Sequence, residues 1–200
     1  WPLGFWLTTT YSAASAPAAA VFAILSKVGA YVIIRLSFLL FAADSGASAG
    51  FGQLWILLGG LATIGFGTAG IIAARDLSIA AAYAVIVSSG TVLAAAGTGN
   101  ADVLGGAVFY LVGSTLACGA LFMLAEVLNR GQDPGARSGR AVFEDEYIDP
   151  FDDEERNEPG LVIPAAVAAL GGAFLISTLM IAGLPPLAGF IGKLAMMDAL

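Results

Sequence analysis

Two lysines are the residues best suited to carry chemistry, and both lie in apolar stretches. Lys27 stands near the middle of residues 16–36, a run long enough to cross a bilayer. Lys193 lies in the last apolar stretch, seven residues after Pro186. A charged group at mid-membrane depth costs at least ~2.5 kcal/mol, so it is retained where it faces a bundle interior, a partner or a water-filled cavity. Loss of water disfavours an ammonium, which lets a buried lysine exchange a proton near neutral pH.

The surroundings of Lys27 fit this interpretation. Ala20, Ala23 and Tyr31 share its helix face, so small side chains leave room for water beside a phenol that can donate or accept a hydrogen bond. We therefore place Tyr31 with Lys27 and Lys193 on a candidate proton path. The alternative for each lysine is a purely structural pairing with a carboxylate or carbonyl.

The second unusual feature is the motif Gly-Leu-Pro-Pro at residues 183–186. Pro185 and Pro186 lack amide donors, so a helix that reaches them leaves backbone carbonyls around Ala182 without partners. In a bilayer such a gap is tolerated where protein or a water-filled cavity covers it, and broken helices recur at transporter ion sites. We predict a broken helix at Gly183, Pro185 and Pro186; an ordinary loop between two helices is the alternative.

These residues must be positioned by membrane-spanning helices. The sequence is 58% hydrophobic and 12% charged, with a mean hydropathy of +0.89, whereas soluble domains carry about 25% charged residues. We predict an all-α polytopic membrane protein, a transmembrane helix bundle of about five spans with the last one broken at Gly183–Pro186. Residues 1–17 are expected to be an interfacial connector. The predicted spans are Pro17–Phe41, Leu54–Ala74, Leu77–Ala96, Leu104–Val127 and Leu161–Ala182.

A small-residue stripe, Gly59, Thr63 and Gly67, is predicted to pack the second span closely against another helix.

Charge is concentrated in residues 129–160, which hold ten acidic residues and four arginines and account for −6 of the net charge of −7. We expect this segment to be a disordered, solvated loop. Arg75 and these arginines fall on one side of a five-span topology, and the positive-inside rule makes that side cytoplasmic. The turns at Asp44 and at 97–102 fall on the other side.

Several other activities are excluded. Residues 46–50 read Gly-Ala-Ser-Ala-Gly, like a nucleophile elbow, but the chain has no histidine to complete a triad. The acidic run lacks the glycine and spacing of a calcium loop. Without histidine and with the single Cys118, no metal-ligand cluster and no intrachain disulfide is expected. We expect no cofactor, no metal site and no nucleic-acid partner.

Three segments together resemble a known family: residues 1–36, the run AVFYLVGSTLACGALFMLAEVL at 107–128, and GLPPLAGFIGKLAMMDAL at 183–200. They are similar to the D subunit of multisubunit monovalent cation/proton antiporters of the Mrp and Pha types, a domain shared with antiporter-like subunits of NADH:quinone oxidoreductase. The resemblance implies that residues 1–200 form the C-terminal-side part of a longer proton-conducting membrane domain. It also implies a multi-pass location in a bacterial inner membrane.

The resemblance assigns roles to particular positions. Lys27 matches the family's central lysine, and Lys193 matches a position that is lysine or glutamate. Ser88 and Ser114 stand where respiratory subunits have histidines, and hydroxyls order water without changing charge near pH 7. A path from Lys27 to Lys193 would then depend on water, Ser88, Ser114, Thr115 and Tyr110.

Three functions follow as alternatives. The first is a transporter subunit, not an enzyme, in a K⁺ or Na⁺/H⁺ antiporter, with the lipid bilayer, protons and other antiporter subunits as partners. The second is a proton-translocating subunit of NADH:quinone oxidoreductase or of a membrane-bound hydrogenase. The third is a non-transporting scaffold subunit that depends on the Gly59/Thr63/Gly67 face.

Overall fold

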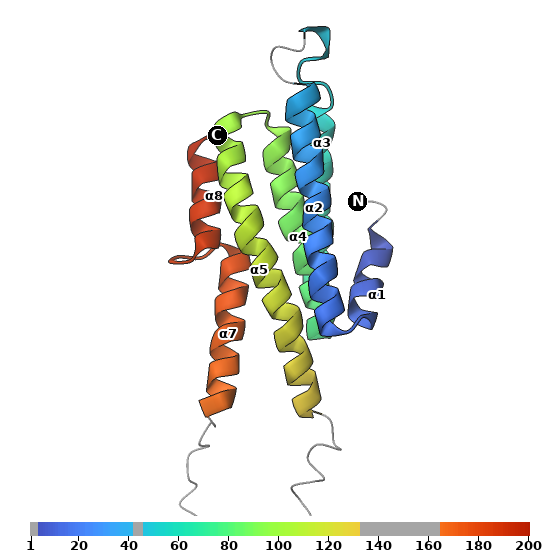
Figure 1. Cartoon of the computed structure of the whole chain (residues 1–200), viewed down its shortest axis with the longest axis vertical. Helices are drawn as coiled ribbons and strands as arrows, with labels where there is room; N and C mark the ends of the chain where they lie inside the picture. The colour runs from blue at the N-terminus through green and yellow to red at the C-terminus, as the bar shows by residue number, and fades with distance from the viewer. Residues whose placement is uncertain (1–3, 42–45, 133–164) are drawn as a thin grey trace, which may run out of the picture.

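The computed structural model of the chain describes residues 4–41, 46–132 and 165–200, and all regular structure in these ranges is helical (Figure 1). Four segments are long and apolar enough to cross a membrane, and a shorter apolar helix covers Val167–Ala182. The prediction of an all-helical polytopic bundle is therefore confirmed. The helices are α1 (Phe5–Ala13), α2 (Ala16–Leu40), the short 3₁₀ helix η1 (Gly46–Ser48), α3 (Gln53–Ala73), α4 (Leu77–Gly97), α5 (Ala101–Gln132), α7 (Ala165–Ala182) and α8 (Ala188–Asp198).

The ends of these helices follow local sequence signals. Pro17 lies in the first turn of α2, where its missing N–H is not needed. At the start of α5, the Asn100 side-chain oxygen accepts the amide of Asp102 at 3.0 Å, as a helix cap does. The helix continues to Gln132, so the acidic loop expected at 129–160 begins at least four residues later than predicted. Residues 133–160 of that loop, and the turn at Asp44, lie outside the described residues.

The connector expected at residues 1–17 is wrong in part, because α1 is a helix that lies beside α2 (Figure 1). Tyr11 is buried, and its hydroxyl shares a 2.6 Å hydrogen bond with that of Ser26. Its ring stacks on Phe122, with 5.5 Å between the ring centroids. Tyr11 therefore serves packing inside the bundle, and the contact of this segment with a membrane interface stays a prediction.

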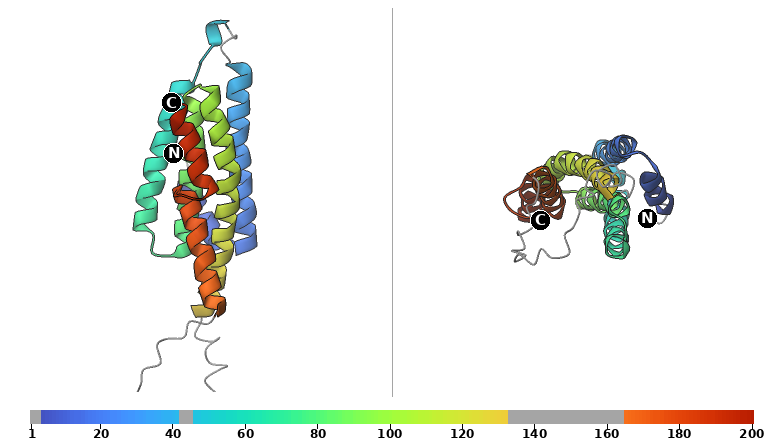
Figure 2. Two further views of the ribbon diagram at one scale, coloured as in Figure 1. Left: turned by 90° about the vertical axis from the view of Figure 1, so that its left-hand side faces the viewer. Right: turned by 90° about the horizontal axis from the view of Figure 1, so that it is seen from below.

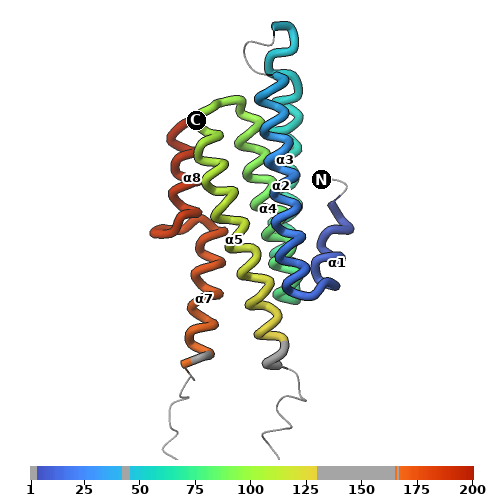
Figure 3. The backbone as a smooth tube through the Cα atoms, viewed as in Figure 1, coloured from blue at the N-terminus to red at the C-terminus, as the bar shows by residue number. Residues whose placement is uncertain are grey.

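The helices are arranged around α4 and α5. Viewed along the bundle axis, α1 lies on one side of the bundle and α7 with α8 on the opposite side (Figure 2). Helices α7 and α8 follow one another along α5 and are separated at about mid-height by the Gly183–Leu187 turn (Figure 3). The turn that holds Arg75 lies at the same end as the C-terminus of α5 and the start of α7, as the predicted topology requires. Which end is cytoplasmic stays a prediction.

Helices α3 and α4 approach one another through glycines. A Cβ built on Gly60 would lie 2.5 Å from the backbone nitrogen of Ala94, and one on Gly97 would collide with the backbone nitrogen of Leu57. The backbones therefore touch where a side chain would hold them apart. This contact fixes α4, which carries one of the predicted site residues.

The predicted packing stripe is only partly in this contact. Gly67 is buried against Val87, but nothing lies within 4 Å of a Cβ on Gly59. Thr63 donates its hydroxyl to the Gly59 carbonyl at 2.6 Å, within the same helix. A four-residue repeat drifts around a helix of 3.6 residues per turn, and Gly60, one position along, takes the place expected for Gly59.

This packing predicts that Gly60→Ala lowers the thermal unfolding midpoint of the assembled protein. The added methyl would meet the backbone of Ala94, and overpacking of this kind costs about 1–3 kcal/mol. Gly65→Ala on the same helix is the matched control, because nothing lies within 4 Å of that Cβ position. Equal midpoints for the two variants in a detergent melting assay would contradict the described α3–α4 contact.

Candidate functional site

The side chain of Lys27 is enclosed within the bundle at 1% exposure. Its Nζ donates to the hydroxyl oxygen of Ser88 at 2.6 Å and to that of Ser114 at 3.1 Å. These serines come from α4 and α5, so the amine on α2 is held by three helices. Among the described residues neither Lys27 nor Lys193 has a carboxylate partner. The positive charge is therefore solvated by neutral oxygens.

The two serines are themselves fully buried and oriented by their own helices. Ser88 donates to the carbonyl of Val85 at 3.0 Å, and Ser114 donates to that of Leu111 at 3.1 Å. Because each hydroxyl proton points at a carbonyl, each oxygen presents its lone pairs to the amine. Two acceptors match the two N–H groups of a neutral amine, whereas an ammonium has one more proton to place.

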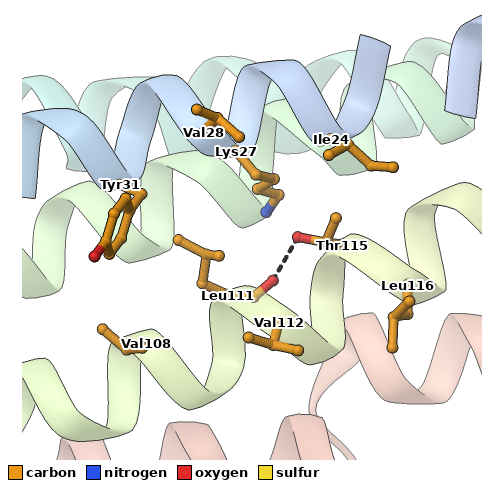
Figure 4. A pocket seen from close by; sticks show the side chains of 9 residues that line it. All are labelled: Ile24, Lys27, Val28, Tyr31, Val108, Leu111, Val112, Thr115 and Leu116. Carbon is orange, nitrogen blue, oxygen red and sulfur yellow. Dashed lines mark hydrogen bonds between the residues drawn. The ribbon is translucent and has the colours of Figure 1, made fainter. Parts of the chain in front are cut away.

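A cavity of about 400 Å³ lies beside Lys27, between α2 and α5. Figure 4 shows Lys27 and Tyr31 on one wall, with Thr115 on the other. Most of the remaining lining is apolar, and Thr115 bonds to the Leu111 carbonyl at 2.6 Å. Tyr31 is 42% exposed. It shares the cavity with the lysine, and its predicted place on a proton path stays a proposal.

Lys193 lies at the break between α7 and α8, as expected from its position after the Gly-Leu-Pro-Pro motif. Its Nζ donates to the carbonyl oxygens of Ile181 at 3.1 Å and Ala182 at 2.9 Å. The same amine is 5.3 Å from the centroid of the Tyr110 ring, within range of a cation–π attraction. The Tyr110 hydroxyl donates to the Ile181 carbonyl at 3.3 Å. A second positive charge is thus held by neutral oxygens and a ring face.

Helix α5 carries residues of both lysine sites. Tyr110 and Ser114 are four residues apart on it, so they lie on one face, about 6 Å apart along the axis. Ser114 bonds to Lys27, and Tyr110 bonds to the carbonyl that Lys193 also contacts. The structure brings Ser88, Ser114 and Lys27 into direct contact. It links Ser114 to the Lys193 site through this face of α5.

Some contacts have no signal in the sequence. The thiol of Cys118 lies 3.8 Å from the Ser88 hydroxyl, so the single cysteine of the chain borders the Lys27 site. A Cβ on Gly183 would lie 2.5 Å from Cδ of Lys193, which ties the turn to the lysine. The side-chain amide of Asn100 donates to the Ala199 carbonyl at 2.7 Å and secures the end of α8. No short sequence pattern predicts contacts over such separations.

Within the described ranges, no three His, Cys, Asp or Glu side chains gather where they could hold a metal ion. The oxygens that do gather are hydroxyls and backbone carbonyls. Apolar spanning helices around two enclosed amines, one of them at a helix break, define a polytopic membrane protein with charged groups inside its bundle.

The chain belongs to the NADH:quinone oxidoreductase/Mrp antiporter transmembrane family, whose model matches residues 1–148. It is 52% identical over all of its 200 residues to the probable D subunit of a K(+)/H(+) antiporter from Rhizobium meliloti (strain 1021), covering 37% of that protein. It is 35% identical to the D subunit of a Na(+)/H(+) antiporter from Bacillus subtilis (strain 168), over 96% of this chain and 34% of the relative. The chain thus spans little more than a third of the length of these relatives, and the resemblance to D subunits is confirmed.

The Lys27 geometry predicts a coupling that a double-mutant cycle can measure. Ser88→Ala with Ser114→Ala should lower the thermal midpoint, because a buried amine without acceptors costs about 1–3 kcal/mol per lost bond. Adding Lys27→Met should restore most of that loss, since no amine is then left to solvate.

Ser89→Ala is the matched control for this cycle. The Ser89 hydroxyl also donates to the Val85 carbonyl, at 2.8 Å, but it does not contact Lys27. If Lys27→Met failed to rescue the double serine variant, the serines would act on stability independently of the lysine.

Proposed function

We propose that the full-length protein is a subunit of a monovalent cation/proton antiporter that carries K⁺ or Na⁺, and that residues 1–200 are the C-terminal-side part of its membrane domain. The observation that carries the proposal is the enclosed Lys27 amine, whose partners among the described residues are two hydroxyls. The printed names of the relatives support the same class. The proposed setting is a bacterial inner membrane, in a complex with other antiporter subunits.

Lys27 is the proposed site at which a proton binds transiently on its way through the bundle. A buried amine that is bonded to hydroxyls has no carboxylate to hold it in the charged form, so its protonation state can respond to its surroundings. Ser88 and Ser114 accept the two N–H groups of the neutral amine, and the remaining position, a lone pair in the amine or a third proton in the ammonium, can face the adjoining cavity. Both forms therefore fit the site without a rearrangement of helices.

The proposed path continues along α5 toward Lys193. Ser114 contacts Lys27, and Tyr110 contacts the Ile181 carbonyl beside Lys193. The gap between Ser114 and Tyr110 is one turn of helix, about 6 Å along the axis, which water can bridge. Tyr31 borders the cavity on the other side of Lys27 and is proposed to order water there.

Charge changes on this path would act on a cation. Coulomb attraction and repulsion are stronger in a bundle interior than in water. A positive charge on Lys27 therefore disfavours a metal cation nearby, and loss of that charge favours it. This gives a physical route by which proton movement drives, or follows, movement of K⁺ or Na⁺.

The proposal predicts that Lys27→Ala abolishes cation-dependent collapse of a pH gradient. The test uses the full-length chain with its neighbouring subunits in everted vesicles from an antiporter-deficient host, with a fluorescent probe of the gradient. In the parent, K⁺ or Na⁺ should dissipate the gradient without an electron donor. Tyr110→Phe should slow the exchange about tenfold without abolishing it, because the ring and its packing are retained.

Arg35→Ala is the matched control, because Arg35 is a cationic residue of the same helix with an exposed side chain. It should exchange at the parent rate when the subunits are equally abundant. If a fully assembled parent complex responds to neither cation, antiport is contradicted. A gradient that instead depends on an electron donor would favour the respiratory or hydrogenase proton-pumping alternative, and unimpaired exchange by Lys27→Ala would favour a scaffold role.

A further inference from the structure

The end of α7 presents two consecutive carbonyls that no helical amide can satisfy. In an unbroken helix the Ile181 carbonyl would accept from residue 185 and the Ala182 carbonyl from residue 186. Both positions are proline and have no N–H. The amides of Gly183 and Leu184 both bond to the Leu179 carbonyl, at 2.9 and 3.1 Å, in the manner of a Schellman cap. The two carbonyls are therefore left to other partners.

The ammonium of Lys193 is the cationic group that contacts both of these carbonyl oxygens. The Lys193 Nζ lies 3.1 Å from the Ile181 oxygen and 2.9 Å from the Ala182 oxygen. The Tyr110 hydroxyl donates to the same Ile181 oxygen at 3.3 Å, and the Tyr110 ring centroid lies 5.3 Å from the amine, with the amine over the ring face. The C-terminal end of a helix also carries partial negative charge that favours a cation.

The chemistry of these oxygens selects the kind of cation. Carbonyls and a phenol are neutral, like the carbonyl rings that replace the hydration shell of K⁺ in channels. Ca²⁺ and Mg²⁺ sites instead rely on carboxylates, and the described part of the site contains none. Unwound carbonyls at helix ends coordinate monovalent cations in other transporters. The site therefore suits an ion of charge +1.

The Lys193 side chain is half-buried, and Lys193 lines a cavity of about 320 Å³ between α3, α4 and α8. Its side chain occupies the space next to Gly183, whose backbone has a φ of +76°. Removal of that side chain would leave the carbonyl oxygens facing a space of ion size.

We infer that the Ile181 and Ala182 carbonyls, with the face of the Tyr110 ring, form a monovalent-cation site that the Lys193 ammonium occupies in place of a K⁺-class ion. When the ammonium is absent, the ion takes its place. This adds a binding site to the proposed function and depends on it only for a use in transport.

The test measures equilibrium binding of ⁸⁶Rb⁺, a K⁺ congener, to the purified complex that contains the full-length chain. Lys193→Met, which keeps side-chain length without the charge, should bind one more Rb⁺ per complex than the parent, and excess K⁺ should displace it. Adding Tyr110→Leu should weaken the gained site about tenfold, because the ring face that attracts the cation is lost. Lys193→Ala, with a smaller side chain, provides an independent second variant, and gel filtration selects assembled complex.

Arg35→Met is the matched control, because it removes a cationic side chain that is exposed on α2 and leaves the α7 carbonyls occupied by Lys193. It should gain no site. The inference is overturned if both assembled Lys193 variants bind no more Rb⁺ than the parent, or if Arg35→Met gains the same site. Rb⁺ binding is measured without a pH gradient. Absence of the extra Rb⁺ site would therefore not contradict antiport, and absence of antiport in vesicles would not change the binding result.

Discussion

The structure depends on solvating two positive charges inside an apolar bundle without opposing carboxylates among the described residues. Lys27 is held by the hydroxyls of Ser88 and Ser114, and Lys193 by the carbonyls of Ile181 and Ala182. A fixed carboxylate would lock each amine in its charged form. Neutral oxygens accept the N–H groups of each amine and add no such opposing charge. An amine held in this way is what the proposed function requires.

Helix α5 is the element that makes both arrangements possible. It lies between α2 and α4 on one side and α7 and α8 on the other, so one face reaches both lysines through Ser114 and Tyr110. The close approach of α8 to α5 depends on glycine, because a Cβ on Gly192 of α8 would lie 2.9 Å from the Tyr110 side chain. The packing that holds α8 in place therefore also positions the ring beside Lys193.

Local signals in the sequence predicted much of this arrangement. The length of the apolar runs gave the ends of α2, α3 and α4 within two residues, and the proline pair placed the break after Ala182. Lys27 stood out because charge is rare in such runs. The contacts between helices were not predictable in the same way: whether Gly59 or Gly60 meets α4 depends on helix rotation, and α1 needed the Tyr11 contact with Phe122 to be recognised.

The oxygens at the end of α7 belong to the main chain, and this has a consequence for how variation among natural sequences should be interpreted. No substitution of a side chain at positions 181 or 182 removes a carbonyl, so these oxygens persist when the residue type changes, and the side chain of Ile181 is constrained only by its packing against the core. The sequence constraint falls instead on Pro185 and Pro186, which have no N–H to donate to these carbonyls. It also falls on Gly183, where a larger residue would collide with the Lys193 side chain. A survey of natural sequences that looks for invariant polar residues would therefore miss the carbonyl oxygens at the end of α7, because prolines and a glycine specify them.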